Sequence, residues 1–132
     1  MVQVITREWE IAKTYIFDIM PRDGMIQLDW NDFQMFAKHH RPLAAVRVED
    51  NISVKQLAEL ATKEILKYTS GKLSCFIMNI YHKEGEEIMM DEIMELAEQM
   101  KVTVEDNMQI KWGVSHKDNM VFNRGICIYA FE

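Results

Sequence analysis

The sequence has few of the residue patterns that mark enzymes, nucleotide-binding proteins or metalloproteins. Its four histidines are dispersed, and its two cysteines, Cys75 and Cys127, have no partner at Cys-x-x-Cys spacing, so we expect no metal site. It contains no Gly-x-Ser-x-Gly elbow and no glycine-rich nucleotide fingerprint. Residues 69–72 resemble the end of a phosphate loop, but Leu66 and Leu73 replace its first glycine and its hydroxyl residue. We therefore expect no bound cofactor and no complete active site.

Long hydrophobic runs are also missing. No apolar stretch approaches the ~20 residues that a membrane helix needs, and residues 1–8 lack the basic and apolar regions of a secretory signal. We therefore expect a cytoplasmic protein with no membrane partner. Because Cys75 and Cys127 lie in apolar, strand-like runs, buried free thiols are the favoured interpretation and a disulfide between neighbouring strands is the alternative.

Clusters of basic residues are absent as well. The sequence has 15 Lys and Arg against 21 Asp and Glu, a formal charge of −6. Since a nucleic-acid partner requires a clustered basic surface, we expect none. Acidic residues are concentrated between residues 84 and 92, where a solvated loop leading into a helix is the simplest explanation.

The composition is that of one ordinary globular domain, 48% hydrophobic and 27% charged, without a linker or repeat between residues 1 and 132. Residues 1–40 are predicted to hold a leading helix, a loop and a short helix. The 3–4 residue apolar spacing of residues 5–20 predicts the first helix, which ends before Pro21 and is followed by a turn at residues 22–24. The short helix is predicted from Asp29 to about residue 39.

Residues 41–132 are predicted to form a sheet-and-helix sandwich. Apolar and β-branched runs predict four strands, and helical periodicity with a capping box at Ser53 and Gln56 predicts two helices. The predicted order is strand 43–48, helix 53–68, strand 73–81, helix 90–101, strand 108–115 and strand 121–131. We expect the last two strands to pair as a hairpin, with Gly125 as a candidate bulge.

The predicted fold class is α/β, of the two-layer α+β kind. Strand–helix–strand crossovers imply a four-stranded mixed sheet with two main helices on one face. Strand 73–81 is the most apolar of the four, so we place it centrally. Helix 90–101 is predicted to bury Ile93, Met94, Ala97 and Met100.

Asp29 and Asp32 allow two interpretations. Asp29 can cap the short helix, and Asp32 adds negative charge to its first turn, where the helix dipole favours it. Capping therefore explains both carboxylates without any function. The alternative is that the acidic pair belongs to a binding surface.

Residues 11–132 resemble the C-terminal half of FtsZ, the bacterial homologue of tubulin. Gly24-Met25-Ile26-Gln27-Leu28-Asp29-Trp30-Asn31-Asp32 is similar to the synergy loop of that family, typically Gly-Leu-Ile/Met-Asn-Leu/Val-Asp-Phe-Ala-Asp. The helix before it resembles the end of the family's long central helix. Ile110–Val114 and Ile126–Ala130 resemble the family's terminal hairpin in position and pattern.

The resemblance implies a half-site. In that family the synergy loop of one subunit meets the GTP held by the next, and its acidic pair orients water or a cation beside the γ-phosphate. Asp29 and Asp32 would be those residues here, with Gly24 and Gln27 completing the partner-binding segment. Gln27 stands where the family usually has asparagine, and the sequence has no counterpart of the GTP-binding half.

Two functions are therefore expected. The first is a non-catalytic FtsZ/tubulin-like interaction module in cell division, which docks on a full-length FtsZ-like GTPase or on itself and at most completes GTP hydrolysis in trans. The second is a homo-oligomeric domain with a structural or small-ligand-binding role and no GTPase connection, in which the loop only caps a helix.

Overall fold

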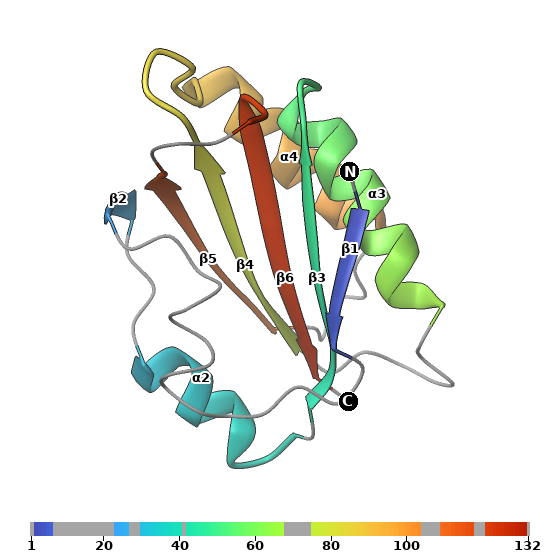
Figure 1. Ribbon diagram of the computed structural model, residues 1–132. Coiled ribbons are helices and arrows are strands. Elements are labelled where there is room, and N and C mark those ends of the chain that lie inside the picture. The colour runs from blue at the N-terminus through green and yellow to red at the C-terminus, as the bar shows by residue number, and fades with distance from the viewer. Residues whose placement is uncertain are drawn as a thin grey trace.

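The structure, a computed structural model, describes residues 2–6, 23–26, 30–40, 42–67, 75–103, 109–117 and 121–131. These residues form a mixed sheet with helices on both faces (Figure 1). The elements are β1 Val2–Thr6, β2 Asp23–Ile26, α2 Trp30–Ala37, β3 Pro42–Asp50, α3 Val54–Leu66, β4 Cys75–His82, α4 Met90–Thr103, β5 Gln109–His116 and β6 Arg124–Phe131. None of the helices in these residues is long and apolar enough to span a membrane.

The α+β class, the mixed sheet and the four predicted strands are confirmed. The strand order is β1-β3-β6-β4-β5-β2, so two short edge strands, β1 and β2, extend the predicted four. The β4–β5 pair is parallel and the other pairs are antiparallel. Strand β4 is buried at every position and central, as its apolar sequence predicts.

The predicted hairpin of the last two strands is wrong. Strand β6 pairs with β3 and β4, and β5 pairs with the other edge of β4. The burial of the two strands gives the physical reason. Strand β6 is buried at seven of its eight positions, as an interior strand is, whereas three of the first four positions of β5 are exposed. Inserting β6 between β3 and β4 therefore covers the more apolar strand.

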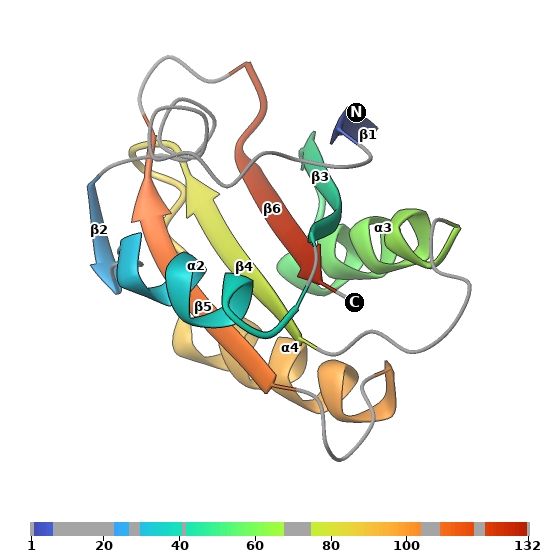
Figure 2. The ribbon, with the colours of Figure 1, turned by 90° about the horizontal axis from the view of Figure 1, so that it is seen from below.

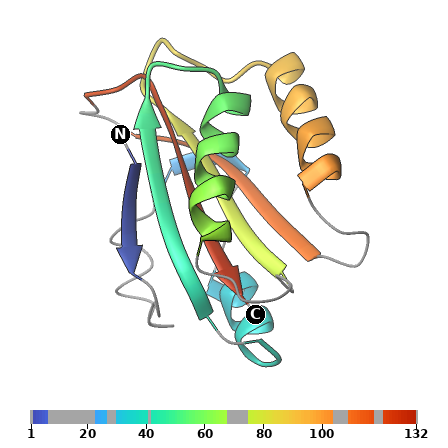
Figure 3. The same cartoon turned by 90° about the vertical axis from the view of Figure 1, so that its right-hand side faces the viewer.

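Helices α3 and α4 lie on one face of the sheet and α2 lies on the other (Figures 1, 2 and 3). The capping box of α3 is confirmed, because Gln56 N donates to Ser53 Oγ at 3.2 Å and Ser53 N donates to Gln56 Oε1 at 3.1 Å. The predicted stripe of α3 is also confirmed. Its buried residues are Val54, Leu57, Ala58, Ala61 and Ile65, and they pack on the inward side chains of β3, β4 and β6.

The inward face predicted for α4 is wrong in part. Leu96 is the buried residue, 2% exposed, and Ile93 is half-buried, whereas Met94 is 64% exposed and Ala97 is also exposed. The side chain of Met100 is outside the described residues. The helix carries two adjacent apolar stripes, so periodicity alone does not fix its rotation. An ion pair between Glu92 and Arg124 of β6 helps to fix it.

Gly125 is not a bulge, since the pairing of β6 with both neighbours continues through it without a shift. It is required for space instead. A Cβ atom at this position would lie 2.6 Å from Tyr81 Oη and overlap the ring. Cys75 and Cys127 are free and buried, as predicted. They lie on neighbouring strands, but Cys127 is opposite Asn79, four residues or ~13 Å along β4 from Cys75, too far for a disulfide.

The leading segment departs from its prediction where it is described. Residues 5 and 6, expected to begin a helix, belong to strand β1, and the rest of the predicted helix lies outside the described residues. Residues 23 and 24 belong to strand β2 and not to a turn. The short helix is confirmed as α2, whose first turn contains Asp32. The predicted cap, Asp29, lies outside the described residues.

Candidate functional site

The candidate site is the segment of residues 22–32, which joins the edge of the sheet to helix α2. Of its four predicted residues, the structure describes Gly24 and Asp32, and Gln27 and Asp29 lie outside the described residues. Gly24 is in β2, where it pairs with Ser115 of β5, and the register shifts between residues 24 and 26. Asp32 is half-buried. The two described residues thus stand on opposite flanks of the segment.

Two aromatic contacts fix α2 on the sheet. Phe33 and Phe36 are buried, and each meets an aromatic ring of β6 edge to face. The ring centroids are 5.2 Å apart for Phe33 and Tyr129, and 5.7 Å apart for Phe36 and Phe131. Such pairs contribute about 0.5–1.5 kcal/mol each beyond area burial. Since Asp32 directly precedes Phe33, its carboxylate is presented on a helix that cannot rotate freely.

Strand β2, which carries Gly24, pairs with the end of β5, and a buried polar pair links that end of β5 to β4. Asn79 and Ser115 exchange hydrogen bonds: Asn79 Nδ2 donates to Ser115 Oγ at 2.9 Å, and Ser115 Oγ lies 3.1 Å from Asn79 Oδ1. Both residues are buried. Because Gly24 pairs with Ser115, this contact positions the start of the candidate segment relative to β4.

A second group of polar residues surrounds Tyr81, and the sequence patterns did not reveal it. Tyr81 Oη donates to Glu49 Oε1 at 2.8 Å. Lys117 Nζ is 3.6 Å from the same oxygen and 5.6 Å from the centre of the Tyr81 ring. Burial, together with the thiol of Cys127 and the Glu49 carboxylate, raises the pKa of Tyr81 far above its ordinary value. The phenol is therefore neutral and acts as a hydrogen-bond donor. The one feature of the sequence that could have pointed to this group is the presence of polar residues, such as Glu49 and Tyr81, within apolar strands.

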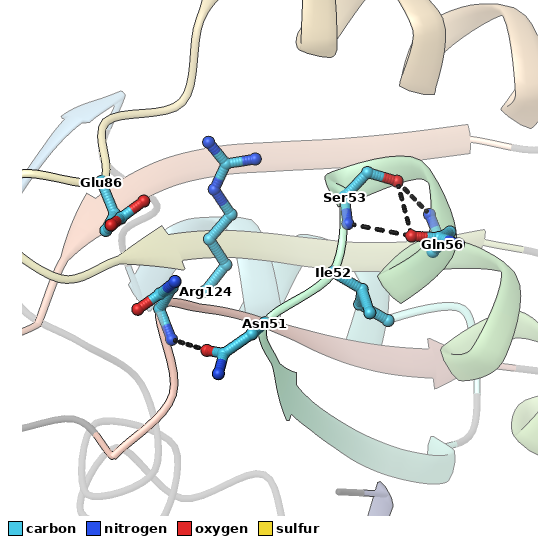
Figure 4. A pocket seen from close by; sticks show the side chains of 7 residues that line it. Asn51, Ile52, Ser53, Gln56, Glu86 and Arg124 are labelled. Atoms are coloured by element: carbon cyan, nitrogen blue, oxygen red, sulfur yellow. Dashed lines mark hydrogen bonds between the residues drawn. The ribbon is translucent and has the colours of Figure 1, made fainter.

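A pocket of about 340 Å³ lies elsewhere, beside the start of α3 (Figure 4). Its walls come from the loops after β3 and β4 and from the start of β6; the lining residues are Asn51, Ile52, Ser53, Gln56, Glu86, Asn123 and Arg124. The polar walls are joined to one another or to nearby residues. Asn123 N donates to Asn51 Oδ1 at 2.8 Å, and Arg124 pairs with Glu92 and donates to the Glu87 carbonyl. These contacts give the pocket a structural role in joining the loops.

The chemistry available in the described residues is limited. They contain no group of three or more His, Cys, Asp or Glu placed to hold a metal ion. Both thiols are poor nucleophiles, because burial raises the pKa of Cys75 and of Cys127 to about 12. The carboxylate of Asp32 is half-buried in the first turn of α2, where the helix dipole stabilises its charge.

Comparisons with known proteins address the fold. No family model and no curated protein matches the sequence. Two solved structures from M. jannaschii resemble the chain at 14% sequence identity. The first, an empty FtsZ dimer, has a TM-score of 0.59 and covers 89% of this chain and 34% of its own. The second, an FtsZ mutant with tryptophan replaced by tyrosine, has a TM-score of 0.55, with coverages of 88% and 35%. The chain has an FtsZ-like fold and spans about one third of the FtsZ chains it matches.

Proposed function

We propose that this chain is a non-catalytic interaction module equivalent to the C-terminal domain of FtsZ, which docks on a filament-forming GTPase through residues 22–32. The FtsZ-like fold over about nine-tenths of the chain carries this proposal. The synergy-loop-like sequence supports it, because the segment that resembles that loop leads from β2 into α2.

The proposed mechanism is the supply of one half of a shared site. The partner subunit holds the nucleotide, and residues 22–32 of this chain cover it. Asp29 and Asp32 then orient water or a cation beside the γ-phosphate, a role that suits carboxylate oxygens. The chain needs no nucleotide pocket of its own for this, and its sequence has no glycine-rich phosphate loop. Anchoring by Phe33 and Phe36 favours such a role, because a positioned carboxylate loses little entropy on docking.

The test is to mix the purified chain with a full-length FtsZ and follow GTP turnover and sedimentation of filaments. We expect the chain to lower the sedimented fraction in proportion to its concentration and to change turnover per FtsZ subunit. The double variant Asp29→Ala, Asp32→Ala should lose the effect on turnover. Glu59→Ala is the matched control, because Glu59 is an exposed carboxylate of α3 on the opposite face of the sheet.

Two results would count against the proposal. One is unchanged turnover and sedimentation with the wild-type chain. The other is an equal loss of effect in the Glu59→Ala control. Light scattering addresses the homo-oligomer alternative, since a stable closed oligomer of this chain that cannot engage FtsZ would replace the proposed function. Circular dichroism of the double variant checks that the chain remains folded, which we expect because losing a first-turn charge costs about 0.3–1 kcal/mol and losing a helix cap about 0.5–2 kcal/mol.

A further inference from the structure

Helix α4 presents an unusual outer surface. Its inward stripe consists of Ile93 and Leu96, which are half-buried and buried. Two further stripes lie side by side on the solvent side of the helix, and the residues of each follow an i, i+4, i+7 spacing. The apolar stripe is Met90, Met94 and Ala97, and the acidic stripe is Asp91, Glu95 and Glu98. All six residues are exposed, and we name them the α4 outer face.

The large side chains of the apolar stripe are more exposed than hydrophobic side chains of this size usually are. Met90 is 71% exposed and Met94 is 64% exposed, and Met89, directly before the helix, is exposed as well. Packing within the domain buries Leu96 and leaves Met94 outside, so the apolar side chain of Met94 is available to another molecule. Methionine is flexible and polarisable, and clusters of exposed methionines are typical of surfaces that accept apolar helix faces. Contiguous exposed apolar residues rimmed by charges mark interaction sites.

Trp112 is a further exposed apolar side chain on this side of the sheet. It pairs with Met78 in the parallel β4–β5 ladder, so both side chains project from the face that carries α3 and α4. Met78 is in the core between the sheet and the helices, and Trp112 is 38% exposed. Figures 2 and 3 show α4 on this side of the sheet, near β5. Tryptophan is among the residues that most often dominate the energy of an interface.

The charge of the surface specifies the partner. Residues 84–98 contain seven Asp and Glu and no Lys or Arg, one third of the acidic residues of the whole sequence. Of the three acids on the α4 outer face, none takes part in an ion pair within the described part of the chain. Glu92, which directly follows Asp91 in the first turn, is compensated by Arg124. An apolar stripe beside an acidic stripe complements a helix that has leucine-like residues on one face and lysine or arginine along its border.

We propose that the α4 outer face is a docking site for a basic amphipathic helix of a protein partner. The apolar side of the partner helix lies on Met90 and Met94, and its basic residues lie along Asp91, Glu95 and Glu98. This site lies on the opposite face of the sheet from α2, so it is independent of the surface proposed to meet a GTPase (Figure 2). The acidic stripe also disfavours an anionic membrane as the occupant.

The test uses an 18-residue, fluorescein-labelled peptide of leucine and lysine with leucines at helical spacing. Its anisotropy is followed as the full chain is added. A scrambled peptide of the same composition removes the amphipathic pattern, and a leucine–glutamate peptide inverts the charge. We expect the double variant Met90→Ser, Met94→Ser to weaken binding about tenfold or more, since part of two methionine side chains is no longer buried. The triple variant Asp91→Asn, Glu95→Gln, Glu98→Gln should weaken binding about tenfold at low ionic strength and less in 0.5 M salt.

Met35→Ser is the matched control, because Met35 is 57% exposed but lies on α2. It should leave the affinity unchanged. With ¹³C-labelled methionine methyl groups, the signals of Met90 and Met94 should shift on addition of the peptide, and the signal of Met35 should not. Equal binding of the scrambled peptide, or unchanged affinity in Met90→Ser, Met94→Ser, would show that only net charge attracts the peptide and would overturn the proposal. Binding of the leucine–glutamate peptide with equal affinity would overturn it too.

Discussion

The contact between Gly125 and Tyr81 allows a stability prediction that can be worked from the structure. Gly125 lies in an unbroken strand, and a Cβ atom there would overlap the Tyr81 ring and lie 2.6 Å from its Oη. The ring cannot move aside without cost. It is fully buried, its hydroxyl donates to Glu49, and Lys117 lies over its face. We therefore expect Gly125→Ala to lower the free energy of unfolding by about 2–3 kcal/mol, at the upper end of typical overpacking costs.

The same substitution should behave differently when the ring is absent. In the Tyr81→Leu background, Gly125→Ala should be neutral or stabilise the chain by about 0.5–1 kcal/mol, since alanine suits a strand interior better than glycine. The double-mutant cycle then gives a coupling energy of about 2–4 kcal/mol between residues 81 and 125. Gly85→Ala is the control. Gly85 has a φ of +87° and no atom within 4 Å of an added Cβ, so its cost of about 1–2 kcal/mol comes from the backbone and should not depend on Tyr81.

The assay is urea denaturation of the four proteins of the cycle, followed by circular dichroism, with the m-value checked for constancy. An equal loss from Gly125→Ala in both backgrounds would mean that the Tyr81 ring is not the obstacle. A neutral effect of Gly125→Ala in the wild-type background would mean that the ring relocates freely. Either result would refute the steric reason for glycine at this position.

Two further predictions concern the core. Leu96→Ala should destabilise the chain by about 2–5 kcal/mol, whereas Met94→Ala should change stability by less than about 0.5 kcal/mol, because Leu96 is buried and Met94 is exposed. Similar losses in urea denaturation would contradict the observed rotation of α4. Burial raises the pKa of Cys75 and of Cys127 to about 12. The folded state therefore keeps both thiol protons, while the thiols of the unfolded state lose theirs near pH 9. The free energy of unfolding should fall as the pH rises above 9, by at most about 1.4 kcal/mol per pH unit for each thiol. The double variant Cys75→Ala, Cys127→Ala should show a shallower fall between pH 8.5 and about 10.5 in urea denaturation, and an unchanged slope would contradict this.

The candidate site was predictable in part. The first-turn position of Asp32 follows from local sequence, because an acidic residue near a helix start is favoured by the backbone dipole wherever the helix lies. The strand character of Gly24 does not follow, since a short edge strand depends on the partner that accepts its hydrogen bonds. The roles of Asp29 and Asp32 toward a partner stay predictions.

Local patterns were sufficient for the elements within residues 42–131. The capping box at Ser53 and Gln56 closes its hydrogen bonds within four residues, and the apolar run of β4 requires burial on both faces whatever its neighbours are. The helix and strand types within residues 42–131 follow from such short-range rules.

Long-range contacts fixed the arrangement. Strand β6 lies between β3 and β4, and α4 turns Leu96 inward, because strands and helix stripes of similar hydrophobicity are distinguished only by the partners that cover them. The need for glycine at residue 125 arises from a tyrosine 44 positions earlier in the chain, which the β4–β6 pairing brings against it. Neighbouring residues determine short-range hydrogen bonding and periodicity, whereas strand order and helix rotation depend on the free energy of burying together surfaces that are distant in the sequence.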